Sequence, residues 1–105
     1  MENQIPLTEG IYYILLSLDR PNHGYGIIQR IQEMTDGRLE MGAGTLYGAL
    51  NTLSEKGWIQ LYSVEKSSRK KKEYIITEEG KEALRVEIKR LEELIKNGEK
   101  VMEGL

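Results

Sequence analysis

Hydrophobic residues in the first third of the chain recur at helical spacing. The first segment has apolar residues three or four positions apart, at Leu7, Ile11, Ile14, Leu15 and Leu18. This spacing predicts a helix with one buried face, capped by Thr8 and ended at Pro21. A second helix is predicted from about Gly24 to Met34, with Gly37 as its C-terminal stop. Residues 39–41 are expected to add one short strand.

The remaining hydrophobic pattern predicts a helix, a β-hairpin and a long helix. The third helix begins at Ala43 or Thr45, runs to Lys56 and ends at Gly57. Two β-prone runs, WIQLYSVE and KEYIIT, flank a short polar connection and predict the hairpin. Thr77 can cap the last helix. This order predicts a mainly α fold with a small β-hairpin, namely a winged helix-turn-helix followed by a long C-terminal helix.

The third helix begins with an unusual stretch, GAGTLYGAL at residues 42–50, which contains three glycines. Each glycine inside a helix costs about 1 kcal/mol relative to alanine. At 3.6 residues per turn, one side of this helix collects the core residues Leu46, Leu50 and Leu53. The opposite side holds Gly44, Gly48 and Asn51, with Thr45 and Tyr47 on its flanks. The outward face is therefore small and polar near the start of the helix.

Two interpretations of this outward face are open. The glycines can permit close packing against another helix, with Tyr47 half filling the core. Alternatively, the helix enters the major groove of DNA by its N-terminal end, where glycines let the backbone approach phosphates. Thr45, Tyr47 and Asn51 would then contact phosphates or base edges, because an asparagine amide pairs well with adenine.

Positive charge is concentrated at the predicted hairpin tip. The chain of 105 residues has 15 Lys and Arg against 17 Asp and Glu, for a net charge of −2. Five of the cations fall within KSSRKKK, at Lys66, Arg69, Lys70, Lys71 and Lys72. A wing with this charge would contact the phosphate backbone in a salt-dependent way. The alternative is a solvated basic turn that keeps a strand edge from pairing wrongly.

The last helix carries a heptad pattern. Apolar residues, interrupted only by Gly98, are spaced 4, 3, 4, 3, 4, 3 at Leu84, Ile88, Leu91, Ile95, Gly98, Met102 and Leu105. Such a stripe is typical of helices that pack on a partner helix. We expect a homodimer whose interface includes Leu84, Ile88, Leu91, Ile95 and Met102, with the N-terminal helix contributing. The alternative is a long helix folded back on the first helix of its own chain.

Composition excludes several kinds of chemistry. The chain has no cysteine and a single histidine, His23, so disulfides and thiolate metal sites are excluded and a zinc site is not expected. Neither a nucleophile–His–acid arrangement nor a phosphate-binding glycine loop is present, so we expect no enzyme activity and no cofactor. The N-terminus does not resemble a signal peptide, and the run 11–16 is too short to span a membrane. A cytoplasmic protein with no membrane partner is expected.

Three stretches together resemble the PadR family of transcriptional regulators. They are HGYGI at 23–27, GAGTLYGALNTLSEKGWI at 42–59 and YIITEEGKEAL at 74–84, within a resemblance that covers roughly residues 7–96. The resemblance implies a bacterial winged-helix regulator, usually a repressor, of the short subfamily with a single C-terminal dimerisation helix. The resemblance also implies that DNA is contacted by Tyr25, Thr45, Tyr47 and the wing cations. It also implies that a small, flat hydrophobic effector can bind at the dimer interface.

Two features depart from the family pattern. Asn51 and Thr52 are neutral where members often have Lys or Arg, so more affinity must come from the wing. The last helix lacks the tryptophan that one drug-binding branch places at the dimer centre, and Trp58 is instead expected in the core.

The sequence therefore predicts two functional parts within one compact domain. Residues 1–77 would form the winged helix-turn-helix DNA-binding domain, and residues 78–105 the C-terminal dimerisation helix. The predicted function is a dimeric repressor that binds double-stranded DNA at a two-fold related operator and is relieved by a small-molecule effector. The alternative is a winged-helix protein–protein interaction module without specific DNA binding.

Overall fold

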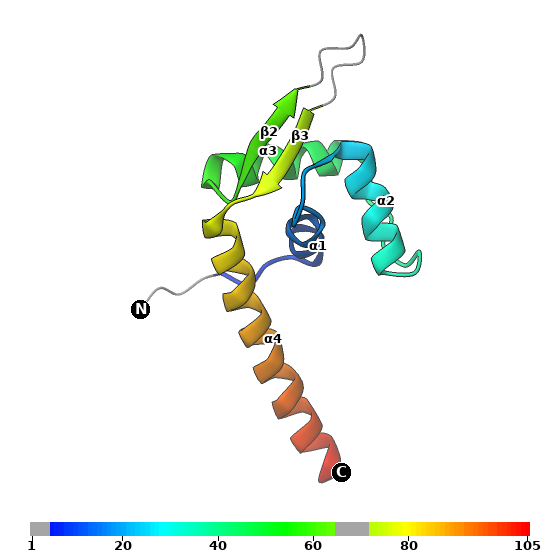
Figure 1. The fold of residues 1–105 in the computed structure, drawn as a ribbon. Coiled ribbons are helices and arrows are strands. Elements are labelled where there is room, and N and C mark those ends of the chain that lie inside the picture. The colour runs from blue at the N-terminus through cyan, green and yellow to red at the C-terminus, as the bar shows by residue number, and fades with distance from the viewer. Residues whose placement is uncertain (1–4, 65–71) are drawn as a thin grey trace.

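The computed structural model describes residues 5–64 and 72–105, which form helices around a small antiparallel sheet (Figure 1). The elements, in chain order, are α1 (Glu9–Ser17), β1 (Asn22–His23), α2 (Gly24–Met34), α3 (Ala43–Lys56), β2 (Ile59–Val64), β3 (Lys72–Ile76) and α4 (Glu78–Glu103). Helices α1, α2 and α3 pack together, and the β2–β3 hairpin lies against α3. Helix α4 starts at the hairpin and extends well beyond the rest of the molecule (Figure 1). The predicted mainly α winged fold with a long final helix is confirmed.

The third strand of the sheet, β1, lies elsewhere in the chain than predicted. Its order is β1-β3-β2, and Asn22 and His23 pair with Tyr74 and Glu73 of β3. The short strand expected at residues 39–41 is wrong, because that segment is a loop whose Leu39 and Met41 pack against the core. A strand of two residues has no alternation of polar and apolar positions, so it leaves no pattern in the sequence.

The core lies where α1, α2, α3 and the hairpin meet. Nine aliphatic side chains are at most 2% exposed there: Ile14, Leu15, Leu18, Ile27, Ile31, Leu46, Leu50, Leu53 and Ile59. Burying one side chain of this size contributes about 1.5 to 3 kcal/mol. The predicted inward face of the third helix is confirmed, since its three leucines belong to this set. The opposite face of α3 is consequently turned away from the core.

The helix ends form where the cap signals predict them. Thr8 accepts a hydrogen bond from the backbone N–H of Ile11 at 3.2 Å, and Thr77 accepts one from Gly80 at 3.1 Å. After α2, Asp36 and Gly37 both adopt the left-handed conformation, with φ of 54° and 79°. The N–H of Gly37 donates back to Gln32 at 2.7 Å, which closes the turn.

Gly80 allows the first turn of α4 to contact the start of the hairpin closely. A Cβ atom at this position would collide with the carbonyl oxygen of Trp58 and with the side chain of Ile76. Only a residue without a side chain lets the first turn of α4 pack directly on the start of the hairpin. The glycine of the TEEG stretch is therefore a close-contact residue that fixes α4 on the winged domain.

A buried carboxylate secures the other side of α4. The Glu87 side chain is 2% exposed and accepts hydrogen bonds from Nε and Nη2 of Arg90, at 3.0 and 2.5 Å. The Arg90 guanidinium, helped by the backbone N–H of Leu7, holds the pKa of Glu87 below its ordinary value, although burial acts in the opposite direction. Glu87 thus connects α4 to the segment that precedes α1.

This pair makes stability depend on pH. Because its pKa is lowered in the folded state, Glu87 adds stability above the unfolded-state pKa of about 4.3, and the contribution disappears as pH falls through the folded-state value. We expect Glu87→Gln to lower the unfolding free energy by about 2 kcal/mol at pH 7, and by much less at pH 3. Urea unfolding at both pH values measures this. The exposed control Glu99→Gln should change little at either pH, and an equal Glu87→Gln deficit at pH 3 would contradict the assignment.

Candidate nucleic-acid interface

The start of α3 is open on its outer side. A Cβ atom at Gly42, Gly44 or Gly48 would meet no other atom within 4 Å in the part of the chain that the structure describes. Close packing against another helix of the same chain therefore does not account for these glycines. Gly42 is the N-cap residue and provides no side-chain cap, and the first turn of α3 has no acidic side chain. The free backbone N–H groups at this end are suited to an anion.

Tyr47 brings the starts of α2 and α3 together. A Cβ atom at Gly24 would lie 2.5 Å from the Oη atom of Tyr47, so the phenol ring extends across the first residue of α2. Tyr47 is nevertheless 54% exposed, and Tyr25 beside this contact is 66% exposed. The HGYG and GTLY stretches, far apart in sequence, thus form one surface with two exposed phenols.

The junction between β1 and α2 is shaped by the same HGYG stretch. Gly26 leaves room for the side chain of Asn22, whose Oδ1 accepts a hydrogen bond from the N–H of His23 at 2.9 Å. Arg30 donates to the carbonyl oxygen of Ser17 at 3.3 Å and pairs with Asp19. The Arg30 guanidinium holds the pKa of Asp19 below its ordinary value. These contacts fix the orientation of α2 relative to α1.

The other predicted contact residues fall into two groups. Thr45 and Asn51 are exposed on α3, with Asn51 on the same outer side as Gly44 and Gly48 and Thr45 on its flank. Lys72 is exposed at the first position of β3. The remaining wing cations lie outside the described residues: Lys66, Arg69, Lys70 and Lys71.

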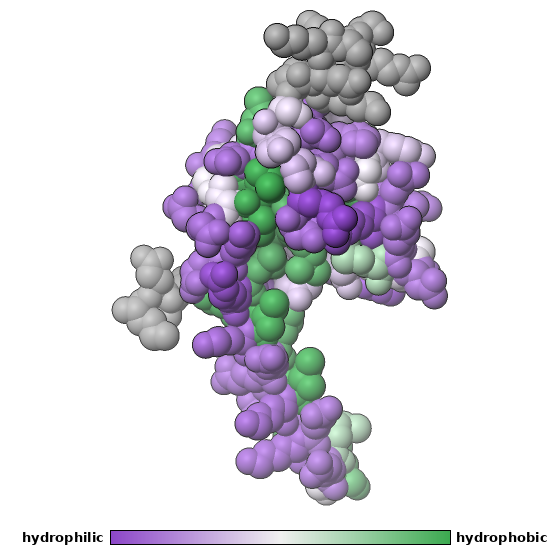
Figure 2. Space-filling model, viewed as in Figure 1, coloured by the Kyte–Doolittle hydropathy of each residue, from purple (hydrophilic) through white to green (hydrophobic). Residues whose placement is uncertain are grey.

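The apolar stripe of α4 divides into two halves. Leu84 and Leu91 are half-buried, and Leu84 packs against the core. Ile88 is 37% exposed, whereas Ile95 and Met102 are 59% and 67% exposed. Figure 2 shows hydrophobic side chains continuing along one side of α4 beyond the body of the molecule, with hydrophilic side chains on the other side. Only the first half of α4 therefore packs on its own chain.

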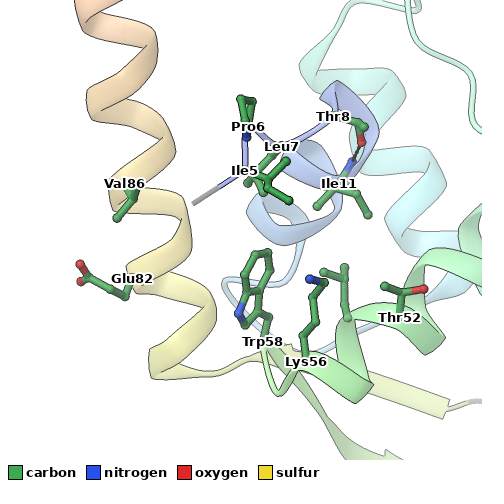
Figure 3. A pocket seen from close by; sticks show the side chains of 11 residues that line it. Ile5, Pro6, Leu7, Thr8, Ile11, Thr52, Lys56, Trp58, Glu82 and Val86 are labelled. Atoms are coloured by element: carbon green, nitrogen blue, oxygen red, sulfur yellow. Dashed lines mark hydrogen bonds between the residues drawn. The ribbon is translucent and has the colours of Figure 1, made fainter. Parts of the chain in front are cut away.

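Trp58 occupies an unexpected position. It is half-buried and packs against the core, as predicted, but its ring also lines a cavity of about 640 Å³ between α1, α3 and α4 (Figure 3). No pattern in the sequence predicted this cavity. Its walls come from three separate segments of the chain, within residues 5–11, 52–58 and 82–86, and no local motif marks their meeting point.

The structure describes neither a membrane-crossing helix nor a metal-binding cluster. Among residues 5–64 and 72–105, no helix is long and apolar enough to cross a membrane. The same residues contain no group of three or more His, Asp or Glu side chains that could hold a metal ion.

A helix-turn-helix followed by a β-hairpin, as in α2, α3, β2 and β3, defines a winged-helix protein. The sequence model of the "Transcriptional regulator PadR-like family" matches residues 13–86 of the chain. The chain therefore belongs to the PadR-like family of transcriptional regulators. No protein with a curated function matches it in sequence.

Solved structures of similar proteins agree with this assignment. A transcriptional regulator from Clostridium thermocellum is 25% identical, with a TM-score of 0.75 over 88% of this chain and 90% of that one. One from Thermoplasma acidophilum is 28% identical, with a TM-score of 0.70 over 89% of each chain. PadR of Bacillus subtilis, solved in complex with operator DNA, is 26% identical, with a TM-score of 0.65 over 76% of this chain and 46% of that one.

Proposed function

We propose that the protein is a dimeric repressor that binds a two-fold related DNA operator through α3 and the basic wing. The open outer side of α3 carries the proposal. The start of this helix is exposed, has free N–H groups and has no acidic side chain in its first turn. With the exposed side chains of Thr45, Asn51 and Thr52, it fits a phosphate-lined groove. Tyr25 and Tyr47 would contact the DNA beside it. The basic run from Lys66 to Lys72 would supply phosphate contacts that do not depend on sequence.

Dimerisation is proposed through α4. Its second half extends beyond the body with apolar side chains exposed at heptad spacing, which a partner helix of the same sequence would cover. Two-fold symmetry would then present two copies of α3 to two half-sites. In this arrangement residues 1–77 form the DNA-binding part and residues 78–105 the dimerisation helix. A small hydrophobic effector would act by binding two dimer geometries with different affinity.

A protein-interaction module is the second candidate function. The neutral Asn51 and Thr52 on α3 and the sequence pI of about 5.5 favour it, since many DNA-binding domains are strongly basic. The concentrated wing charge favours DNA. Measurements of specificity and of salt dependence separate the two functions.

Fluorescence anisotropy tests the proposal directly. The protein is titrated onto the duplex from upstream of its own gene and onto a shuffled duplex, at two salt concentrations. We expect preference for the natural duplex. The triple substitution of Lys70, Lys71 and Lys72 by alanine should reduce the log–log salt slope by up to about 5, because the two wings of the dimer together lose six cations. The matched control replaces Lys89, Lys96 and Lys100, three exposed cations of α4. Equal salt slopes for the two triple variants would contradict a DNA-binding wing.

A further inference from the structure

His23, the single histidine of the chain, lies between the two parts of the proposed DNA-binding surface. It directly precedes Gly24, the first residue of α2, across which the Tyr47 ring extends. In the sheet it is the partner of Glu73, and the residue before Glu73 is Lys72, where β3 begins after the wing. His23 therefore connects the surface of exposed phenols to the base of the wing.

His23, Glu73 and Ser63 form a row across the three strands of the sheet. Glu73 of β3 is the register partner of His23 on one side and of Ser63 on the other. Directly opposed residues of an antiparallel pair share one face of the sheet, with Cβ atoms about 4.5 to 5.5 Å apart. The Ser63 hydroxyl donates a hydrogen bond of 2.6 Å to Oε1 of Glu73. The Glu73 carboxylate is thus held on the same face as the imidazole and within its reach.

Neither side chain of this pair is engaged by another charge. The imidazole makes no cap hydrogen bond to α2. Within residues 5–64 and 72–105, neither His23 nor Glu73 takes part in an ion pair. Strands β1, β2 and β3 and the first turns of α2 and α3 contain a single acidic residue, which is Glu73. One carboxylate therefore lowers the positive potential of a surface that is otherwise neutral or basic.

The other ionisable groups around His23 do not account for a response near neutral pH. Histidine is the side chain whose charge ordinarily changes between pH 5 and 8, whereas aspartate, tyrosine, lysine and arginine ordinarily titrate outside the range from pH 6 to 8. Before β1, Asp19 pairs with Arg30 of α2 and lies 3.9 Å from Arg20. The remaining groups on the surrounding elements are Lys72 and Tyr74 on β3, Tyr25 on α2, Tyr47 on α3 and Tyr62 on β2.

We propose that protonation of His23 strengthens DNA binding, so that the protein binds its operator more tightly at acidic pH. The imidazolium would pair with Glu73 and offset the negative charge that repels phosphates. In the proposed complex with DNA, on which this regulatory role rests, each half of the dimer gains one unit of positive charge beside the phosphates. Because the proton acts on phosphate contacts, its effect does not depend on the operator sequence.

Fluorescence anisotropy at pH 6 and pH 8, at one ionic strength, tests the proposal with the natural and the shuffled duplex. We expect both duplexes to bind about 5-fold or more tightly at pH 6. His23→Gln should bind with the same affinity at both pH values, within about 1.5-fold. Glu73→Gln should bind more tightly than the wild type at pH 8, by about 3-fold. The control Glu99→Gln removes an exposed carboxylate of α4 and should keep the wild-type ratio.

Proton NMR follows the titration of the wild-type protein directly, because a single histidine gives a single imidazole Cε1–H signal. Its midpoint should move to higher pH when a duplex is bound, since the coupling between proton and DNA is reciprocal. In the free Glu73→Gln protein it should move to lower pH, because the paired carboxylate is gone. This measurement does not depend on the folding of His23→Gln, which urea unfolding checks.

Each contrary result overturns a stated part of the proposal. A midpoint unchanged by DNA, or a folded His23→Gln protein with the wild-type affinity ratio, would overturn the role of His23. A free-protein midpoint unchanged by Glu73→Gln would overturn the pairing with Glu73. A full pH response without preference for the natural duplex would overturn the proposed repressor and leave the role of His23 in phosphate binding intact.

Discussion

We expect the substitution Gly48→Glu to abolish DNA binding while leaving the protein folded. Position 48 lies on the outer side of α3 with open space around it, so a glutamate side chain fits the folded chain. In the complex it would place a negative charge and extra volume between α3 and the phosphates, and we expect affinity to fall at least about 100-fold. Fluorescence anisotropy with the natural duplex measures the loss, and circular dichroism checks the fold.

Two further variants separate contact from folding. Gly48→Ala should raise the unfolding free energy of the free protein by up to about 1 kcal/mol, because alanine favours the helix and meets no neighbour. Asn97→Glu adds the same charge on an exposed position of α4 and should leave DNA binding nearly unchanged. If the Gly48→Glu protein is unfolded, the glycine is needed for folding. If it is folded and binds DNA normally, Gly48 does not lie against the DNA.

We also expect a large loss of dimerisation and of DNA affinity from a substitution at Ile95. Its side chain is 59% exposed on the half of α4 that extends beyond the body, so Ile95→Glu should not disturb the folded chain. In the proposed dimer it would bury a charge in an apolar interface, which is strongly unfavourable. We expect sedimentation equilibrium to show a monomer at micromolar concentration, and affinity for a two-fold related duplex to fall about 100-fold or more, since two linked half-site contacts become independent.

The neighbouring position supplies the control. Lys96→Glu introduces a negative charge one residue away, outside the heptad positions of the stripe, and should leave the dimer intact. Dissociation by both substitutions would indicate a general charge effect. A Ile95→Glu protein that stays dimeric would show that another surface joins the two chains.

Elements built from local pattern could be predicted from the sequence, and those built from long-range contact could not. The core leucines of α3 and the caps at Thr8 and Thr77 follow from helical periodicity and cap chemistry, and both were predicted. Strand β1 exists because β3 has a free edge beside Asn22, which no local pattern reveals. The heptad predicted the apolar stripe, but not that Leu84 packs on the core of its own chain.

The candidate site shows the same division. The outer position of Gly48 on α3 follows from the helix period, because it depends only on the neighbouring residues. The contact between Tyr47 and Gly24 joins residues 23 positions apart, and the cavity at Trp58 needs the segment before α1 and the first turns of α4 in place. Sequence alone separates these residues, and only the fold brings them together.

The close contact between Gly80 and Trp58 makes α4 behave as a lever. The first half of α4 is fixed on the winged domain, so the domain and the whole helix of 26 residues, about 39 Å long, move as one body. A tilt of about 10° at the far end of α4, where the partner would be held, would therefore move the other end of α4 and the winged domain by about 7 Å, roughly two base-pair steps along a duplex. A change too small to disturb the packing around Trp58 would be large enough to move the second DNA-reading half out of register with its site.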